Sequence, residues 1–227
     1  MQKLKKIAIT IGLIVLLLIG LVLTFSEPIK EAAVRIMGQQ RFEKVTANQI
    51  QKNQHKKATY NFNEVKTLGD SEVAHAATNQ NKVSTVGKLA IPSVKMYLPV
   101  MKGLSNDVLS TGAGTMKAKQ TMGKGNYALA GHYMTNKGIL FSPLRDVSVG
   151  DQVYLTDLKH VYTYQVTSKQ VVNETDVSVI NNVHGKKLVT LVTCSSATEG
   201  ETNRIVVQGQ LTAIKKATKQ NLKVFEN

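Results

Sequence analysis

Residues 188–194 read Leu-Val-Thr-Leu-Val-Thr-Cys, a strand-like stretch that ends in the only cysteine of this 227-residue chain. Successive side chains of a strand point to opposite faces, so Leu188, Thr190, Val192 and Cys194 share one face. The polar run at 195–203 cannot continue as strand core. The pattern predicts a strand that ends at a rim and aims the thiol toward an open surface. An inert, buried cysteine is the alternative at this point.

Further short apolar runs, broken by Gly, Pro and Asn, follow one another from residue 85 onward at spacings of roughly 8 to 15 residues. The expected strands cover 87–91, 94–100, 127–131, 152–155, 161–166, 188–194 and 205–211, with helical turns at 104–110 and 139–144. This pattern of short apolar runs separated by turn residues favours an all-β sandwich or barrel over alternating β and α units. The lysine-rich residues 214–227 are expected to form a C-terminal tail that frays.

The N-terminus contains nineteen consecutive uncharged residues, 7–25. A helix of that length, at about 1.5 Å per residue, spans roughly 28 Å, close to the thickness of a bilayer's hydrocarbon core. Lysines in residues 1–6 precede the run, and no small-x-small cleavage site follows it. We therefore expect a cytoplasmic N-terminus, an uncleaved single-pass membrane anchor at 7–25 and an extracellular remainder. A buried helix of a soluble protein is the less favoured reading.

Residues 26–84 are expected to form an extracellular stalk or linker. From residue 37 this segment is rich in Gln, Asn, Lys, Thr and Ala, with too few apolar residues for a core of its own. The pattern is compatible with a helix around 42–50. It leaves open whether the segment packs on the domain at 85–213.

The formal net charge is +14, from 25 lysines and four arginines against 15 acidic residues. The excess is spread along the chain, and with no Trp and only five Phe there is little to stack on bases. Nucleic acid is therefore not an expected partner. Solvated lysines near an anionic membrane or wall are the favoured interpretation, and a dedicated polyanion site is the alternative.

An exported chain with one thiol cannot form an internal disulfide, and a reactive thiol needs a base or cation nearby. His132 ends the apolar run 127–131, and the small residues before it would leave room for a substrate. The other histidines lie in the stalk or in turns: His55, His75, His160 and His184. Arg204 opens a strand ten residues after Cys194, so an antiparallel return would bring the two side by side.

The fork of N–H donors on arginine suits an oxyanion or a substrate carbonyl. Surface positions for His132 and Arg204 are the alternatives. No HxxxH, CxxC or Asp-rich calcium loop is present, so no metal site competes for the cysteine.

These residues resemble the motifs of class A sortases. Thr190 to Cys194 is similar to the TLxTC signature, Ala130-Gly131-His132 stands where the family has its histidine, and Arg204 where it has its arginine. The stretches 89–93, 112–116 and 125–132 are also similar. The resemblance implies an eight-stranded sortase-type β-barrel with short helices over about residues 85–213. It implies a cysteine transpeptidase on the outer face of a Gram-positive membrane.

By this resemblance Cys194 attacks the threonine carbonyl of a Leu-Pro-x-Thr-Gly type sorting signal on a surface protein. An amine of the lipid-linked peptidoglycan precursor then resolves the thioacyl intermediate. His132 transfers protons and Arg204 stabilises the oxyanion. The loop at 171–185 is expected to form the wall of the signal's pocket. The substrate-binding residues implied are Ala130, Val177, Val179, Ile180, Val192 and Thr193. Core packing is the alternative for the apolar ones.

Some class A sortases bind calcium between two loops beside the pocket. Here the first loop carries Lys117, Lys119 and Lys124, and the second has Asn181-Asn182 where an acid would be expected. We therefore expect no cofactor and activity independent of calcium. Two other functions stay open: a membrane-anchored thiol protease or hydrolase, and a non-enzymatic module that binds wall polyanions.

Overall fold

The computed structural model describes residues 2–226, and within them eight strands close into a barrel in the order β1-β2-β3-β4-β7-β8-β6-β5. The strands are β1 Thr85–Ile91, β2 Met96–Met101, β3 Ala113–Thr115, β4 Asn126–Ala130, β5 Gln152–Thr156, β6 His160–Asn173, β7 Leu188–Cys194 and β8 Asn203–Lys216. The expected all-β barrel is confirmed. Strand β7 has the bounds that its alternating sequence predicted.

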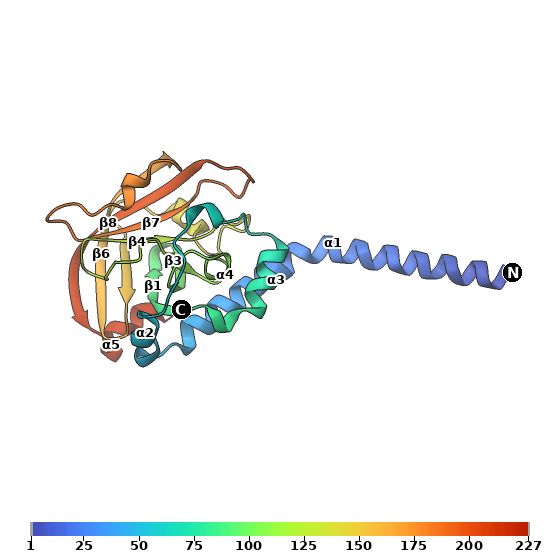
Figure 1. Ribbon diagram of the computed structural model, residues 1–227, viewed down its shortest axis with the longest axis horizontal. Coiled ribbons are helices and arrows are strands. Elements are labelled where there is room, and N and C mark those ends of the chain that lie inside the picture. Colours follow the sequence, from blue (N-terminus) through green and yellow to red (C-terminus); the bar gives the residue numbers. More distant parts are fainter. Residues whose placement is uncertain (1, 227) are drawn as a thin grey trace.

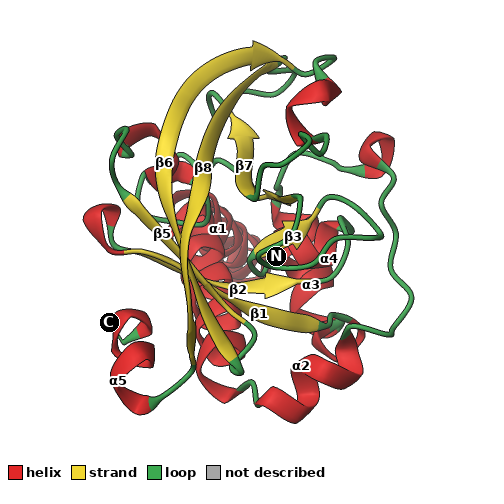
Figure 2. Cartoon of the chain, turned by 90° about the vertical axis from the view of Figure 1, so that its left-hand side faces the viewer, coloured by secondary structure: helices red, strands yellow, loops and turns green. Residues whose placement is uncertain are grey.

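The long strands β6 and β8 pair antiparallel from His160↔Lys216 to Asn173↔Asn203, and they curve together in Figure 2. Register shifts at Thr163/Tyr164 and Val166/Ser168 mark bulges, which bend such ribbons. The sequence predicted that the sixth strand would end at residue 166. It continues to Asn173 because its backbone pairs with β8, although residues 167–170 are polar and interrupt the apolar pattern.

Strand β3 was not predicted, because its three residues are too few to show a period. All three are buried, and β3 pairs parallel with β2 and antiparallel with β4. The barrel interior is filled by large apolar side chains that are fully buried, among them Leu89, Leu129, Phe141, Leu155, Tyr164 and Leu191. Short helices fill the connections: η3 Pro92–Val94, α4 Asn106–Leu109, η4 Ser142–Asp146 and η5 Val177–Ile180.

Residues 26–84 are helical in large part and pack on the barrel. The elements are the end of α1 (Gln2–Lys44), α2 (Ala47–Asn53), η1 (Phe62–Glu64), α3 (Asp70–Thr78) and η2 (Gln80–Lys82). Val34 and Met37 of α1, with Val73 and Ala76 of α3, join the main hydrophobic core. The sequence left open whether residues 26–84 pack on the barrel. They do, because the barrel supplies the hydrophobic core that this segment lacks by itself.

The first part of α1 projects away from the barrel (Figure 1) and contains the uncharged run 7–25. Within the part of the chain that the structure describes, no helix meets the length and hydropathy needed to cross a membrane. The membrane anchor is therefore not confirmed by the structure.

The expected fraying of the tail is wrong. After β8 the chain forms α5 (Lys219–Leu222) and η6 (Lys223–Phe225). Phe225 is buried in a small cluster with Phe42, Ala90 and Val161. One buried aromatic side chain at the end of a lysine-rich segment gives no periodic signal. Ala217, Leu222 and Val224 pack against the same cluster and help to dock the segment on the barrel.

Candidate active site

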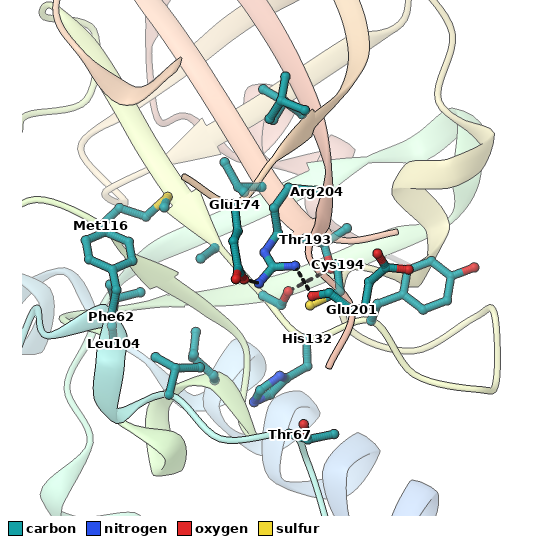
Figure 3. Close-up of a pocket in the computed structure, with 18 of the residues that line it drawn as sticks. Phe62, Thr67, Leu104, Met116, His132, Glu174, Thr193, Cys194, Glu201 and Arg204 are labelled. Atoms are coloured by element: carbon teal, nitrogen blue, oxygen red, sulfur yellow. Dashed lines mark hydrogen bonds and ion pairs between the residues drawn. The ribbon is translucent and has the colours of Figure 1, made fainter. Parts of the chain in front are cut away.

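Cys194 is the last residue of β7, and its register partner across the antiparallel pair is Arg204 of β8. The backbone N–H of Ser195 donates to the carbonyl oxygen of Asn203 at 3.0 Å, so the pairing extends one residue beyond the cysteine. The thiol is partly exposed at the rim of the barrel. The side-by-side placement predicted for Cys194 and Arg204 is therefore observed (Figure 3).

His132 follows strand β4, which runs parallel to β7 with Ala130 opposite Val192. The Thr193 hydroxyl donates to the carbonyl oxygen of Gly131 at 2.8 Å, and Gly131 N–H donates to Val192 at 3.2 Å. Two parallel neighbouring strands therefore end together, which brings the histidine to the same rim as the cysteine. Figure 3 shows both side chains in one pocket.

The structure explains the absence of a side chain at Gly131 differently from the sequence-based expectation. A Cβ on this residue would lie 2.5 Å from the ring of Phe141, which is fully buried. The small residue therefore makes room for a core aromatic ring, whereas room for a substrate was expected. This contact fixes the backbone just before His132.

Burial governs the protonation of His132. Its side chain is buried, and desolvation lowers its pKa from 6.5 to about 4, against a weaker opposite effect of Glu72 on α3. Its Nε2 atom is buried and has no hydrogen-bond partner among the described residues. The imidazole is therefore neutral at neutral pH, and a neutral imidazole has one ring nitrogen that can accept a proton.

The thiol of Cys194 is also neutral at neutral pH. Burial raises its pKa, Arg204 lowers it, and Glu201 and Glu174 raise it further. The thiol and the imidazole are thus both held in their uncharged forms. A thiolate forms when a proton passes from the cysteine to a base, so the pair becomes ionic only as a minority species.

Arg204 is held by three oxygen atoms. Its Nη2 group forms an ion pair with the Glu174 carboxylate, and Nη1 donates to the carbonyl oxygens of Glu201 and Asn203. Sequence analysis missed both acidic residues. The signal for Glu174 lies only in the pairing of Asn173 with Asn203, which places the residue after β6 beside the start of β8.

The three candidate catalytic residues line one cavity of about 840 Å³. Each of the expected substrate-binding residues also lines it: Ala130, Val177, Val179, Ile180, Val192 and Thr193. Val177 is exposed, whereas Ile180 and Val192 are largely buried and Thr193 is bonded to the neighbouring strand. The cavity thus has an apolar wall on η5 and a polar end at the thiol.

Residues 89–212 match the family model of the sortase domain. The chain belongs to the sortase family. It is 43% identical over 208 residues to sortase A of Listeria monocytogenes, which covers 91% of this chain and 93% of the relative. It is 39% identical to sortase A of Streptococcus agalactiae, over 87% of this chain and 82% of the relative. These relatives support assignment to class A.

The solved structure of L. monocytogenes sortase A superposes with a TM-score of 0.61 at 45% identity. The match covers 63% of this chain and 98% of that one. The fold is therefore the sortase-type β-barrel expected from the motifs. Sortases are cysteine transpeptidases that anchor surface proteins to the cell wall, and this chain is such an enzyme.

The pocket-wall loop of this sortase is tied to the barrel through Asn126, which is buried at the start of β4. Its amide group donates to the carbonyl oxygens of Val179 and Asn181, at 3.1 Å each. Its Oδ1 atom accepts from the Thr190 hydroxyl at 2.7 Å. The loop that carries η5 is therefore positioned by a buried polar network and not only by apolar packing.

Lys117 makes a second tie, from the loop between β3 and β4. Its Nζ donates to the carbonyl oxygen of Ile180 at 2.8 Å and to Oδ1 of Asn182 at 3.1 Å. Within the described part of the chain, no three His, Cys, Asp or Glu side chains gather where they could hold a metal ion. An ammonium group thus already bridges the two loops.

Residues 60–68, which were expected to belong to a linker, form part of the cavity wall of the sortase. The segment is held on the barrel by Leu104 N–H, which donates to the Thr59 carbonyl at 2.9 Å, and by Lys66 N–H, which donates to Asn106 at 2.9 Å. Figure 3 shows Phe62 and Thr67 at the edge of the pocket. No sequence signal connects this polar segment to a site that lies after residue 130.

Proposed function

We propose that this sortase cleaves a Leu-Pro-x-Thr-Gly type signal between the threonine and the next residue. It then joins the threonine carboxyl group to an amine of the lipid-linked peptidoglycan precursor. The observation that carries the proposal is the convergence of Cys194, His132 and Arg204 on one cavity with an apolar wall. An extended peptide with apolar leucine and proline side chains suits that wall.

In the first half-reaction the Cys194 sulfur attacks the threonine carbonyl carbon, and the proton of the thiol passes to His132. The C–N bond of the signal then breaks, and His132 returns the proton to the leaving amine. This leaves a thioester on Cys194. The neutral resting pair suits this sequence, because a neutral imidazole has a ring nitrogen that can accept the proton.

In the second half-reaction the acceptor amine attacks the thioester carbonyl and loses a proton to His132. The C–S bond breaks, and the sulfur is protonated again as the new amide leaves. Each half-reaction passes through a tetrahedral oxyanion next to Arg204, whose guanidinium can donate to it. The position opposite Cys194 in the β7–β8 register supports this role.

The location that we propose is the outer face of a Gram-positive cell membrane, with the N-terminus in the cytoplasm. The uncharged run at 7–25 and the lysines before it support a single-pass anchor. We also propose that the enzyme works without calcium, because Lys117 already connects the two loops between which some class A sortases bind that ion.

Mass spectrometry after incubation with a labelled sorting peptide tests the mechanism. We expect a thioacyl adduct on Cys194 that is absent in Cys194→Ala and in His132→Ala. His184→Ala is the matched control, because His184 is exposed and does not line the cavity. Adding a glycine or diamine nucleophile should convert the adduct into an amide. Release of free acid alone, even with the amine present, would indicate a hydrolase instead.

A further inference from the structure

Glu174 connects the pocket-wall loop to the strand that carries Arg204. It is the first residue after β6, and its backbone N–H donates to the Thr202 carbonyl at 2.7 Å. Its carboxylate forms the ion pair with Arg204 Nη2. Glu174 is therefore fixed by its backbone as well as by its side chain, and Figure 3 shows its carboxylate meeting the guanidinium from one side.

The contacts of Arg204 leave a defined part of the guanidinium for a ligand. The group has five N–H donors in a rigid plane. Nη1 serves two backbone carbonyls, and Nη2 serves Glu174. Among the described residues, Nε–H and the second Nη2–H have no acceptor. Because the plane is rigid, the three contacts decide where these remaining donors point.

Fold stability alone does not account for this ion pair. The Glu174 side chain is 43% exposed and the Arg204 side chain 22%. Ion pairs at such exposure contribute little to the free energy of folding, typically about 1 kcal/mol or less. Both partners lie at the rim of the cavity with the candidate nucleophile. The arrangement therefore favours a role at the site.

We propose that Glu174 is a positioning residue: its carboxylate takes one edge of the Arg204 guanidinium and so directs the remaining N–H donors toward the acyl group bound to Cys194. The proposal rests on the proposed role of Arg204 in acyl transfer. A second effect follows from charge. Burial is the largest cause that raises the Cys194 pKa, and Glu174, like Glu201, adds to it against the opposite effect of Arg204.

Two substitutions separate orientation from charge. Glu174→Ala removes both the acceptor and the charge, and Glu174→Gln keeps an acceptor oxygen without the charge. Glu199→Ala is the matched control, because Glu199 is exposed in the β7–β8 loop. The readouts are kcat and KM with a labelled sorting peptide, the pH dependence of Cys194 alkylation by iodoacetamide, and Tm.

We expect Glu174→Ala to lower kcat/KM by roughly three- to tenfold, the scale of a misplaced positioning group. Glu174→Gln should recover most of that loss. In both variants the alkylation midpoint should move to lower pH, because a carboxylate that raises the thiol pKa is gone. In an Arg204→Ala background, Glu174→Ala should cause no further loss of kcat/KM.

Equal kcat/KM in Glu174→Ala and Glu199→Ala would overturn the proposal. So would a loss of kcat/KM on adding Glu174→Ala to the Arg204→Ala variant that is as large as the loss in the wild-type background. A wild-type enzyme that forms no thioester would overturn the proposed function instead. Alkylation needs no substrate, so the link between Glu174 and Cys194 would still be decided. If Glu174→Gln and the wild type had the same alkylation midpoint, the electrostatic effect of Glu174 on the Cys194 thiol would be refuted.

Discussion

Cys194 and Arg204 are register partners at the open end of β7 and β8. Deeper in the same ladder, Leu191 pairs with Val207 and Val192 with Val206, and all four side chains are buried. Leu191 and Val207 pack in one hydrophobic cluster and Val192 and Val206 in another, on opposite faces of the sheet, so a slip of one residue would move each side chain to the wrong face. The core packing of the barrel therefore also fixes the thiol beside the guanidinium.

Burial of neutral His132 makes the fold sensitive to acid. Its folded pKa of about 4 lies below the ordinary 6.5, so the unfolded chain binds this proton more tightly. The resulting stability is complete above pH 6.5 and is lost as the pH falls toward 4. Linkage gives about 2 to 3 kcal/mol between pH 7 and 4.5.

Urea unfolding at the two pH values should therefore show a smaller loss for His132→Gln than for the wild type. His184→Gln, at an exposed loop position, should behave as the wild type does. Identical losses in all three proteins would contradict the assignment of a buried neutral imidazole.

Transpeptidation by the wild type should be unchanged by EGTA and by millimolar calcium. Lys117→Ala should raise KM for the sorting peptide several-fold, because the tie to Ile180 and Asn182 is lost. Lys119→Ala serves as the control, since Lys119 is exposed on the same loop. A several-fold rise in wild-type rate on adding calcium would show that an ion and not an ammonium group orders these loops.

Asn126→Ala should both destabilise the barrel and loosen the pocket wall. The change leaves the carbonyls of Val179 and Asn181 and the Thr190 hydroxyl without this partner. Unsatisfied buried groups of this kind give a loss of about 2 to 3 kcal/mol in the free energy of unfolding. Urea titration measures the loss of stability, and the KM for the sorting peptide, which should rise, measures the loosening of the pocket wall.

Asn181→Ala is the control for this change, because its side chain is exposed and its backbone carbonyl is retained. If Asn126→Ala lost stability with KM unaltered, the network would serve the barrel and not the pocket.

Phe225→Ala tests the docking of the C-terminal segment. The ring packs with Phe42, Ala90 and Val161, so its removal should lower the free energy of unfolding by about 3 kcal/mol. Denaturant unfolding measures the change, with the exposed Lys223→Ala as control. A variant as stable as the wild type would mean that the Phe225 ring contributes nothing to the docking of the segment.

Much of the barrel was predictable, because alternation along 188–194 and apolar runs between turn residues are local signals. The motifs around His132 and Cys194 were likewise visible as residues at strand ends. The ends of β6 and β8, the strand β3 and the docked tail were not, since each depends on backbone pairing or burial against distant residues.

The sequence alone determined the fold class, the sortase family and the candidate nucleophile, because each rests on local pattern or motif. The tertiary structure decided how these residues act. Burial lowers the pKa of His132 and raises that of Cys194, so each is held more firmly in its neutral form. Strand register brings Glu174 to Arg204, and packing turns residues 60–68 into a wall of the cavity. These relations depend on desolvation and on contacts between segments far apart in the chain, which a linear pattern does not contain.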